Sequence, residues 1–406
     1  MPPRDRMASS FAEIAALQQR GQSAAASCSP EFELLLCCAR TVPDAARIEA
    51  LTDATIDWRA LLDLSREHNV RPPVWQALHS TCWDRVPENI RVECDEAYRS
   101  FTGRNLLLTS ELLRVTAAFD EAGLRVAVMK GAAIAQMAYG DFALREFGDF
   151  DLLIRPDDFF RATELLQQLG YNPEWKCGDS TAFHFLRYVG EYKLTRDVMR
   201  TDVDLHWRVV TKATALAPSL SDFPSGFKPV SLAGSTVLSF APQDLPLYLA
   251  AQGGWDQWSD LRRICDLAEF LRRYPEIDLE PTLALAQRLG GLRSMLVGLF
   301  LASKLLGADL PEPVVRRIHA DAAIAELAET ATHNLLRNVH AGEPVSRYVF
   351  QLKAKQGLWG KIALAYSILF ERTAEDANWI MLPRPLWWLY FLLRPLRIGL
   401  RMLRLA

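Results

Sequence analysis

The sequence has no Cys-x-x-Cys pair and an odd number of cysteines. The seven thiols lie mostly in apolar surroundings, at Cys28, Cys37, Cys38, Cys82, Cys94, Cys177 and Cys265. Disulfide frameworks and structural zinc sites need paired or clustered cysteines, so this pattern argues against both. A reducing compartment, the cytoplasm, is therefore expected.

Long apolar runs are also absent. The first residues, MPPRDRMASSFAEIAAL, lack the continuous apolar segment of a signal peptide. No stretch approaches the roughly 18 apolar residues that a membrane-spanning helix needs. The body of the chain is therefore predicted to be neither secreted nor membrane-spanning. Residues 1–29, rich in Ala, Ser, Gln and Arg, lack a sustained apolar stripe and are predicted to be a flexible leader.

The chain has no large excess of charge of either sign. The formal net charge is −3 over 406 residues, and the sequence pI is near 6.2. This balance gives no overall attraction to nucleic acid, so bulk DNA or RNA binding is not expected. Hydrophobic residues make up 50% of the chain, which is enough for a large buried core.

Two long sections have the apolar spacing of amphipathic helices. In residues 30–119 the spacing appears in EFELLLCCAR, WRALLDLSREH and NLLLTSELLRVTAAF, which predicts an N-terminal helical domain of about five helices. It returns in residues 241–375, most clearly in WSDLRRICDLAEFLRR, which predicts a second helical domain. A Pro/Ser/Gly-rich segment, about residues 217–235, is interpreted as a connector.

Between these sections, residues 120–240 have the pattern of a small α/β core. LRVAVMKG is a β-rich run that ends in a glycine, and GAAIAQMAY after it favours a helix. FGDFDLLI predicts a second strand, and TDVDLHWRVV predicts a third. RPDDFFRATELLQQLGY between them predicts a helix with Pro156 in its first turn and Gly170 at its end. The expected order is β-α-β-α-β, and the expected class is α+β, a small core flanked by N- and C-terminal helical domains.

Acidic side chains gather on one face of two of the predicted strands. Because side chains alternate along a strand, Asp149 and Asp151 share a face, and so do Asp202, Asp204 and His206 on the third strand. Like charges this close repel each other unless a cation lies between them. Oxygen-only ligands favour Mg²⁺ or Mn²⁺ over zinc. Two such ions about 3.5–4 Å apart are the usual arrangement for in-line displacement at phosphorus.

Further residues are candidates for contacts with phosphate groups. Lys130 and Gly131 lie between a predicted strand and a predicted helix start, where backbone N–H groups can receive a phosphate. Arg145 can pair with a triphosphate as a bidentate fork, although such an arginine is more often a salt-bridge partner. His206 can orient Asp204 or contact a phosphate; the alternative is a histidine hydrogen-bonded at the end of a strand. A D-x-D pair also occurs by chance, so the interpretation rests on order and spacing together.

Two stretches resemble a known family. They are LRVAVMKGAAIAQMAYGDFALREFGDFDLLIRPDDFFRATELLQQLGY, residues 124–171, and VDLHWR, residues 203–208. Their order and spacing are similar to those of an uncharacterised bacterial nucleotidyltransferase family within the polymerase-β-like nucleotidyltransferase superfamily. The resemblance extends to IDWRALLDLSREHNVRPPVWQAL, to WSDLRRICDLAEFLRR and to the ending LPRPLWWLYFLLRPLR. It covers most of the chain beyond residue 30.

The resemblance implies a nucleotidyltransferase that moves an NMP from an NTP, ATP foremost, to an acceptor by two-metal chemistry with Mg²⁺ or Mn²⁺. Asp149, Asp151 and Asp204 would be the catalytic metal ligands. Lys130 and Gly131 would stand in place of the Gly-Ser phosphate loop of the superfamily. The acceptor, whether a protein, a peptide or a small molecule, cannot be read from the sequence.

Departures from the family pattern keep a second hypothesis open. The loop serine is absent, and where relatives carry basic residues ahead of a tryptophan this chain has Gln252, Trp255 and Asp256. The residues that keep the pattern there are Trp258, Leu261 and Asp266. These departures favour a catalytically inactive nucleotidyltransferase fold that serves as a nucleotide-binding or scaffold protein at a membrane-associated assembly.

The end of the chain, residues 376–406, is predicted to be a basic amphipathic tail. Arginines follow each other at helical spacing opposite a wide apolar arc, at Arg394, Arg397, Arg401 and Arg404. Residues 384–406 are therefore predicted to meet an anionic membrane surface, peripherally at its inner face, with the aromatic residues at 379–390 at headgroup level. The alternative is that the segment packs on the protein's own helices or on a partner. The longest apolar run, Leu386 to Leu393, has eight residues and cannot span a bilayer.

Overall fold

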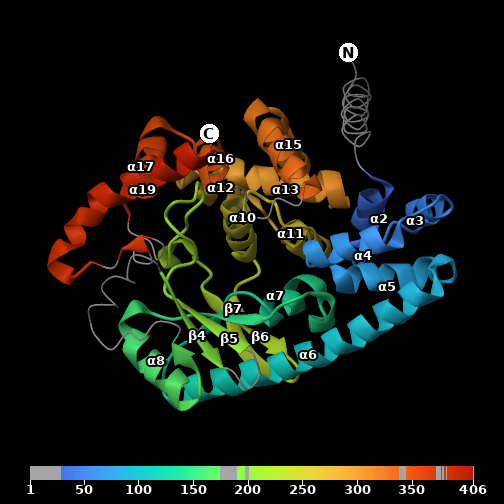
Figure 1. Cartoon of the computed structure of the whole chain (residues 1–406), viewed down its shortest axis with the longest axis horizontal. Coiled ribbons are helices and arrows are strands. Elements are labelled where there is room, and N and C mark those ends of the chain that lie inside the picture. Colours follow the sequence, from blue (N-terminus) through green and yellow to red (C-terminus); the bar gives the residue numbers. More distant parts are fainter. Residues whose placement is uncertain are drawn as a thin grey trace.

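The computed structural model describes residues 29–173, 190–196, 201–337, 344–371, 376, 379–380 and 382–405. A mixed sheet and a long helix lie at one end of the molecule, and helices from both ends of the sequence form the other (Figure 1). The predicted α+β class is confirmed. The predicted leader lies outside the described residues, apart from Ser29.

Five strands form the main sheet, in the order β1-β2-β5-β4-β3. The strands are β1 (Ala127–Val128), β2 (Asp149–Leu153), β3 (Asn172–Pro173), β4 (Glu191–Arg196) and β5 (Thr201–His206). β2 and β5 are parallel to each other, and the remaining neighbours in this sheet are antiparallel. The three strands that the sequence predicts are β1, β2 and β5, and they lie next to each other.

One face of this sheet packs on two helices, α6 (Glu88–Glu121) and α8 (Phe159–Gln168) (Figure 1). Alternation along the two parallel strands turns their apolar side chains into this core, namely Phe150, Leu152, Val203 and Leu205. As predicted, Pro156 opens the entry to α8, in the 3₁₀ turn η4 (Pro156–Asp158), and Gly170 follows its end with a φ of +89°. The polar residues of β2 and β5 are left on the opposite face.

The connector predicted at residues 217–235 is wrong, because half of a β-hairpin lies in it. β6 (Phe227–Leu232) pairs with β7 (Ser235–Phe240), after the short turn η5 (Leu220–Asp222). The two residues between the strands, Ala233 and Gly234, have φ values of +48° and +82°. A two-residue hairpin loop with both central residues at positive φ matches the twist of its strands.

The chain between β1 and β2 is helical, as GAAIAQMAY predicts. It forms α7 (Ala132–Ile134), the π-helical turn η2 (Ala135–Tyr139) and the 3₁₀ turn η3 (Phe142–Leu144). Gly140 ends η2 in the left-handed conformation, with a φ of +76°. A π-helical turn is rare and bulges the helix locally.

Between residue 29 and the sheet the structure has five helices, in agreement with the periodicity. They are α2 (Pro30–Cys38), α3 (Ala45–Thr52), α4 (Trp58–Glu67), α5 (Arg71–Thr81) and α6, with the turn η1 (Trp83–Arg85) before α6. Side chains cap the first three helices, because Ser29, Asp44 and Asp57 each accept a backbone N–H of the first turn. The second half of α6 carries the chain under the sheet.

The helices described after the sheet form the other end of the molecule, together with those that precede it. They are α10 (Leu245–Trp255), α11 (Leu261–Arg273), α12 (Glu280–Arg288), α13 (Leu292–Leu306), α14 (Glu312–His319), α15 (Ala322–Leu336), α16 (Pro344–Ala354), α17 (Leu358–Phe370), the turn η6 (Arg384–Leu389) and α19 (Tyr390–Leu405). Within the described part of the chain, no helix is both long and apolar enough to cross a membrane.

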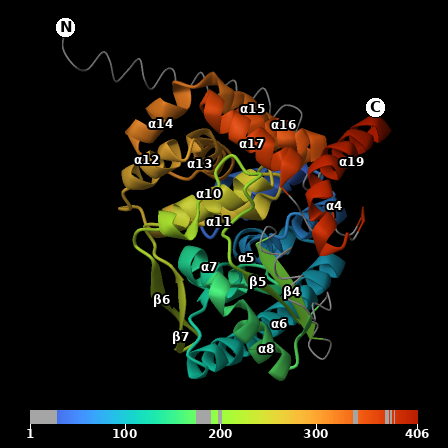
Figure 2. The same ribbon diagram turned by 90° about the vertical axis from the view of Figure 1, so that its left-hand side faces the viewer.

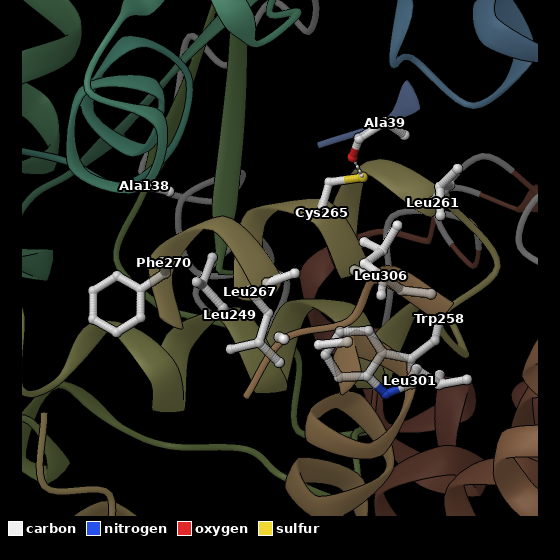
Figure 3. Packing of buried hydrophobic residues seen from close by; sticks show 14 of the residues in the cluster. Ala39, Ala138, Leu249, Trp258, Leu261, Cys265, Leu267, Phe270, Leu301 and Leu306 are labelled. Atoms are coloured by element: carbon white, nitrogen blue, oxygen red, sulfur yellow. Dashed lines mark hydrogen bonds between the residues drawn. The ribbon is translucent and has the colours of Figure 1, made fainter. Parts of the chain in front are cut away.

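The two helical sections share one hydrophobic core. Buried residues of α2 to α5 and of α10 to α15 belong to the same cluster. Cys265 of α11 points toward α2 (Figure 3), and its Sγ donates to the backbone O of Ala39 at 3.3 Å. The helices before and after the sheet therefore form one body, although the sheet separates them in the sequence.

Trp258 fills the centre of this body. Its side chain is fully buried near Leu301 and Leu306 (Figure 3), and its φ is +56°. A Cβ atom at Gly253 would lie 2.3 Å from the indole ring, and one at Gly298 would lie 2.1 Å from it. Both glycines are therefore needed to make room for Trp258, whose role is structural.

Candidate metal centre

The acidic residues of β2 and β5 lie opposite each other. In the parallel register Asp149 pairs with Asp202, and Asp151 pairs with Asp204. Adjacent strands are about 4.8 Å apart, and residues in register point to the same side. The alternation read from the sequence therefore brings carboxylates from two strands together on the face away from α6 and α8.

Three of these side chains converge on one point. Ligand atoms of Asp151, Asp204 and His206 all lie within 4.8 Å of one another, close enough to share a metal ion. Asp151 and His206 are buried, and Asp204 is half-buried. We call Asp151, Asp204 and His206 the β2–β5 trio.

Asp149 lies at the edge of the β2–β5 trio. Its side chain is half-buried and is not part of the group within 4.8 Å, but its charge acts on Asp204. Asp202, the register partner of Asp149, pairs with Lys193 of β4 at 2.7 Å and is neutralised there.

The pKa of Asp204 is raised to about 6. Burial is the main cause, because it penalises the charged form, and the negative charge of Asp151 adds to it. Asp151 behaves in the opposite way. Burial alone would raise its pKa, but the charge of Lys130 and the hydrogen bond from His206 outweigh burial and hold the pKa of Asp151 well below its usual range.

Lys130 contacts the β2–β5 trio through Asp151, with its Nζ 2.6 Å from Oδ1 of that residue. The backbone explains this position, because Met129 donates its N–H to the O of Asp151 at 2.9 Å and so extends the β1–β2 ladder to the residue before Lys130. Gly131 then turns the chain away with φ +61° and ψ −127°, a conformation that side chains disfavour. The Lys-Gly pair thus places one positive charge against the buried acid.

His206 contacts Asp151 rather than Asp204. Its Nε2 lies 3.1 Å from Oδ1 of Asp151, and its Nδ1 lies 3.8 Å from Oε2 of Glu191 on β4. An imidazole that donates to a carboxylate from Nε2 holds that carboxylate in place. This contact matches the alternative, a histidine hydrogen-bonded at the end of a strand, and the carboxylate that it orients is that of Asp151 and not that of Asp204. A contact between His206 and a phosphate stays a prediction.

Arg145 is the salt-bridge partner that the sequence left as the alternative to a triphosphate ligand. Its guanidinium donates twice to Asp266 of α11, at 2.7 and 2.9 Å, and both side chains are buried. Tyr139 also donates to Asp266, at 3.1 Å. These bonds join the segment before β2 to the helical body, and they leave Arg145 outside the β2–β5 trio.

The residues that depart from the family pattern are also structural in their contacts. Gln252 is buried and donates to the O of Val209 at 2.9 Å, which ties α10 to the chain after β5. Asp256 pairs with Arg263 at 3.1 Å. Neither residue belongs to the β2–β5 trio.

Sequence reasoning missed the two residues of β4 that border the site, Glu191 and Lys193. In the antiparallel register Lys193 lies opposite Asp204, and Glu191 lies opposite His206. The alternation in EYKLTR, with Tyr192 and Leu194 buried, was the available signal.

The donors present fit a divalent cation. Two carboxylates and an imidazole suit Mn²⁺, and with water in the remaining positions they also suit Mg²⁺. Since the trio includes a nitrogen donor, the oxygen-only argument against zinc does not apply to it. Asp151 already has a counter-ion in Lys130. A bound cation would neutralise the second negative charge, that of Asp204, which Asp151 repels.

A comparison with known protein families gives a match. A family model described as "Uncharacterised nucleotidyltransferase" matches residues 54–307. The match runs from just before α4 to Gly307, the residue that caps α13, and so includes every residue of the site. The search of curated proteins gives no match.

Proposed function

This chain belongs to the uncharacterised nucleotidyltransferase family, and we propose that it transfers an NMP from an NTP, ATP foremost, to an acceptor with release of pyrophosphate. The observation that carries the proposal is the meeting of Asp151 and Asp204 from two parallel strands at one point with His206. Carboxylates of separate strands that converge in this way are what a nucleotide-bound metal requires. The acceptor is a protein, a peptide or a small molecule.

Asp151 and Asp204 are the proposed metal ligands, with Asp149 as a third carboxylate at the edge of the site. A bound Mg²⁺ or Mn²⁺ would neutralise charge that develops on the phosphoryl oxygens and would activate the attacking oxygen. His206 holds the Asp151 carboxylate in one orientation through the 3.1 Å contact. The protein's part is positioning, which is the larger contribution in phosphoryl transfer.

Lys130 has two tasks in this proposal. In the absence of a metal its ammonium neutralises Asp151 at 2.6 Å. When a cation takes over that role, the ammonium on its flexible stem is free to pair with a phosphate oxygen of the NTP. Gly131 permits the turn that presents Lys130 to the site.

The same ion pair favours a second candidate function, a catalytically inactive nucleotide-binding or scaffold protein. A lysine that already neutralises Asp151 lowers the gain from binding a metal there, and the loop serine of the superfamily is replaced. The two functions differ in turnover, since both allow a nucleotide to bind.

The test is a transfer assay with each of the four α-labelled NTPs, cell lysate as the source of acceptor, and Mg²⁺ or Mn²⁺. Label should enter an acceptor with the wild type, and Asp204→Asn and Asp149→Asn should each lower the rate at least about 100-fold. The matched control is Asp202→Asn, the same change on the same face of β5, which should stay within about threefold because Asp202 pairs with Lys193.

Transfer at the wild-type rate by Asp204→Asn would refute the enzymatic proposal. If no label is transferred while calorimetry detects ATP binding that depends on a divalent cation, the inactive nucleotide-binding function is correct.

A further inference from the structure

The C-terminal helices present apolar side chains outward and turn charged ones inward. On α19, Leu392, Leu396 and Leu400 recur at four-residue spacing and are 60%, 54% and 45% exposed. On the opposite side of the same helix, Arg394 and Arg397 are buried. This orientation is the reverse of that of a surface helix in water.

Asp376 holds α19 in this orientation. It accepts a hydrogen bond from Arg394 at 2.9 Å and forms an ion pair with Arg397 at 2.8 Å, and Arg394 also donates to the O of Ile368 at 2.8 Å. The prediction that the arginine stripe faces lipid headgroups is therefore wrong for these two residues, and the alternative of packing on the protein's own helices holds for them. Their ion pairs fix the leucines on the outside.

The apolar surface continues onto α17, which lies beside α19 (Figure 2). Phe391 of α19 stacks on Phe370 with ring centroids 4.3 Å apart and lies 6.4 Å from the ring of Tyr366. From Tyr366 the exposed stripe runs back along α17 through Ile362 to Trp359, which is 81% exposed. We call this surface the C-terminal apolar face: Trp359, Ile362, Tyr366, Phe391, Leu392 and Leu396.

We propose that the C-terminal apolar face lies on the surface of an anionic lipid bilayer. A contiguous exposed patch of this kind marks a site of association in a folded protein. Its charges favour an anionic lipid as the partner, since residues 358–405, from the start of α17 to the end of α19, contain seven basic and three acidic residues. Without the buried group of Arg394, Arg397 and Asp376, five basic and two acidic residues remain.

The shape and composition of the face also fit a bilayer. The leucines of α19 form a ridge along one helix, and a ridge inserts between lipid headgroups without needing a complementary groove. Trp359, Tyr366 and the 63% exposed Trp388 are of the residue types that prefer the headgroup region. Because no described helix can cross a membrane, the contact is peripheral.

The test is flotation of the full-length protein, without nucleotide, on two kinds of vesicle: phosphatidylcholine alone, and phosphatidylcholine with about a third phosphatidylglycerol. The fraction of wild-type protein that floats should be at least about tenfold larger with the anionic vesicles than with the neutral ones, and it should fall in high salt. Leu392→Asp/Leu396→Asp should lower flotation at least about tenfold, and Trp359→Ser should lower it severalfold.

The matched control is Leu106→Asp/Leu107→Asp on α6, where both leucines are more than half exposed but lie away from the C-terminal helices. It should float like the wild type, and circular dichroism should be the same for all variants.

The proposal is overturned if the wild type does not float, if both double variants behave alike, or if neutral vesicles bind equally well. Light scattering that finds a dimer of the wild type and a monomer of Leu392→Asp/Leu396→Asp, without flotation, would assign the face to a second copy of the chain. None of these outcomes depends on the proposed nucleotidyltransferase activity.

Discussion

The Arg145–Asp266 pair is buried and the β2–β5 trio is buried except for the half-buried Asp204; both are charged, but they differ in charge balance. In the pair, one guanidinium meets one carboxylate through two hydrogen bonds, and the charges cancel. In the trio, the ammonium of Lys130 pairs with Asp151, whereas burial and the charge of Asp151 raise the pKa of Asp204 to about 6. A balanced pair joins two parts of the fold, whereas surplus negative charge provides a place for a cation.

The largest expected effect comes from unbalancing the pair. Asp266→Ala leaves the buried guanidinium of Arg145 without its counter-ion and should lower the free energy of unfolding by about 3–5 kcal/mol. Urea unfolding followed by circular dichroism measures this. The double variant Arg145→Met/Asp266→Leu removes both charges and should recover most of the lost stability. A double variant as unstable as Asp266→Ala would show that the loss does not come from the unpaired charge of Arg145.

Removing the lysine that pairs with Asp151 should have the next largest effect. Lys130→Met leaves Asp151 with only the hydrogen bond from His206, so the free energy of unfolding of the metal-free protein should fall by about 2–3 kcal/mol. Millimolar Mn²⁺ should restore part of the loss, because it supplies the missing positive charge. Equal urea midpoints with and without Mn²⁺ would count against a metal site.

Removing the surplus charge should stabilise the metal-free protein while abolishing transfer. Asp204 has a folded-state pKa near 6, above the ordinary value of 3.8, so its charged form opposes folding. Asp204→Asn should therefore raise the free energy of unfolding by about 1–2 kcal/mol at pH 8. Between pH 6 and pH 4 Asp204 is protonated in the folded wild type but still largely ionised in the unfolded chain. The stability advantage of Asp204→Asn should therefore shrink over this pH range and vanish below it. If the difference in the free energy of unfolding between Asp204→Asn and the wild type stayed constant from pH 8 to pH 4, the pKa of Asp204 would not be raised in the folded protein.

The smallest effect is expected at a neighbouring acid that has its own partner. Asp202→Asn removes a half-exposed charge that pairs with Lys193, so the free energy of unfolding should change by less than about 0.5 kcal/mol. Thermal unfolding at pH 8, in parallel with Asp204→Asn, separates the two positions. If Asp202→Asn and Asp204→Asn raised the free energy of unfolding equally, the proposed difference between the paired Asp202 and the repelled Asp204 would be wrong.

Much of this site was predictable from local pattern. Alternation along β2 and β5 fixes which side chains share a face, so the sequence predicts Asp149 with Asp151 on one strand and Asp204 with His206 on the other. The register between the strands, which brings Asp151, Asp204 and His206 together and leaves Asp149 at the edge, does not follow from alternation. The partner of Arg145 was not predictable, because Asp266 is 121 residues away and only tertiary packing brings the two together. The same limit applies to Arg394, whose burial depends on Asp376.

The fold was predictable where strands and helices are long or strongly periodic. The β6–β7 hairpin was missed because Pro229 and the Ser/Gly-rich composition around it are typical of a connector. A two-stranded hairpin tolerates an exposed proline, since its outer edge needs no backbone donor. β4 was missed because it follows a long segment without a strand pattern, although its own alternation is regular.

Calorimetric titration of Mn²⁺ into the metal-free protein at pH 8, in wild type and in Asp204→Asn, tests the central claim most directly. We expect saturable binding of Mn²⁺ to the wild type, tighter in the presence of an NTP, and a loss of at least about 10-fold in affinity in the variant. Asp202→Asn in the same titration should match the wild type. Absence of binding to the wild type, or equal binding to wild type and Asp204→Asn, would contradict a metal site at the β2–β5 trio.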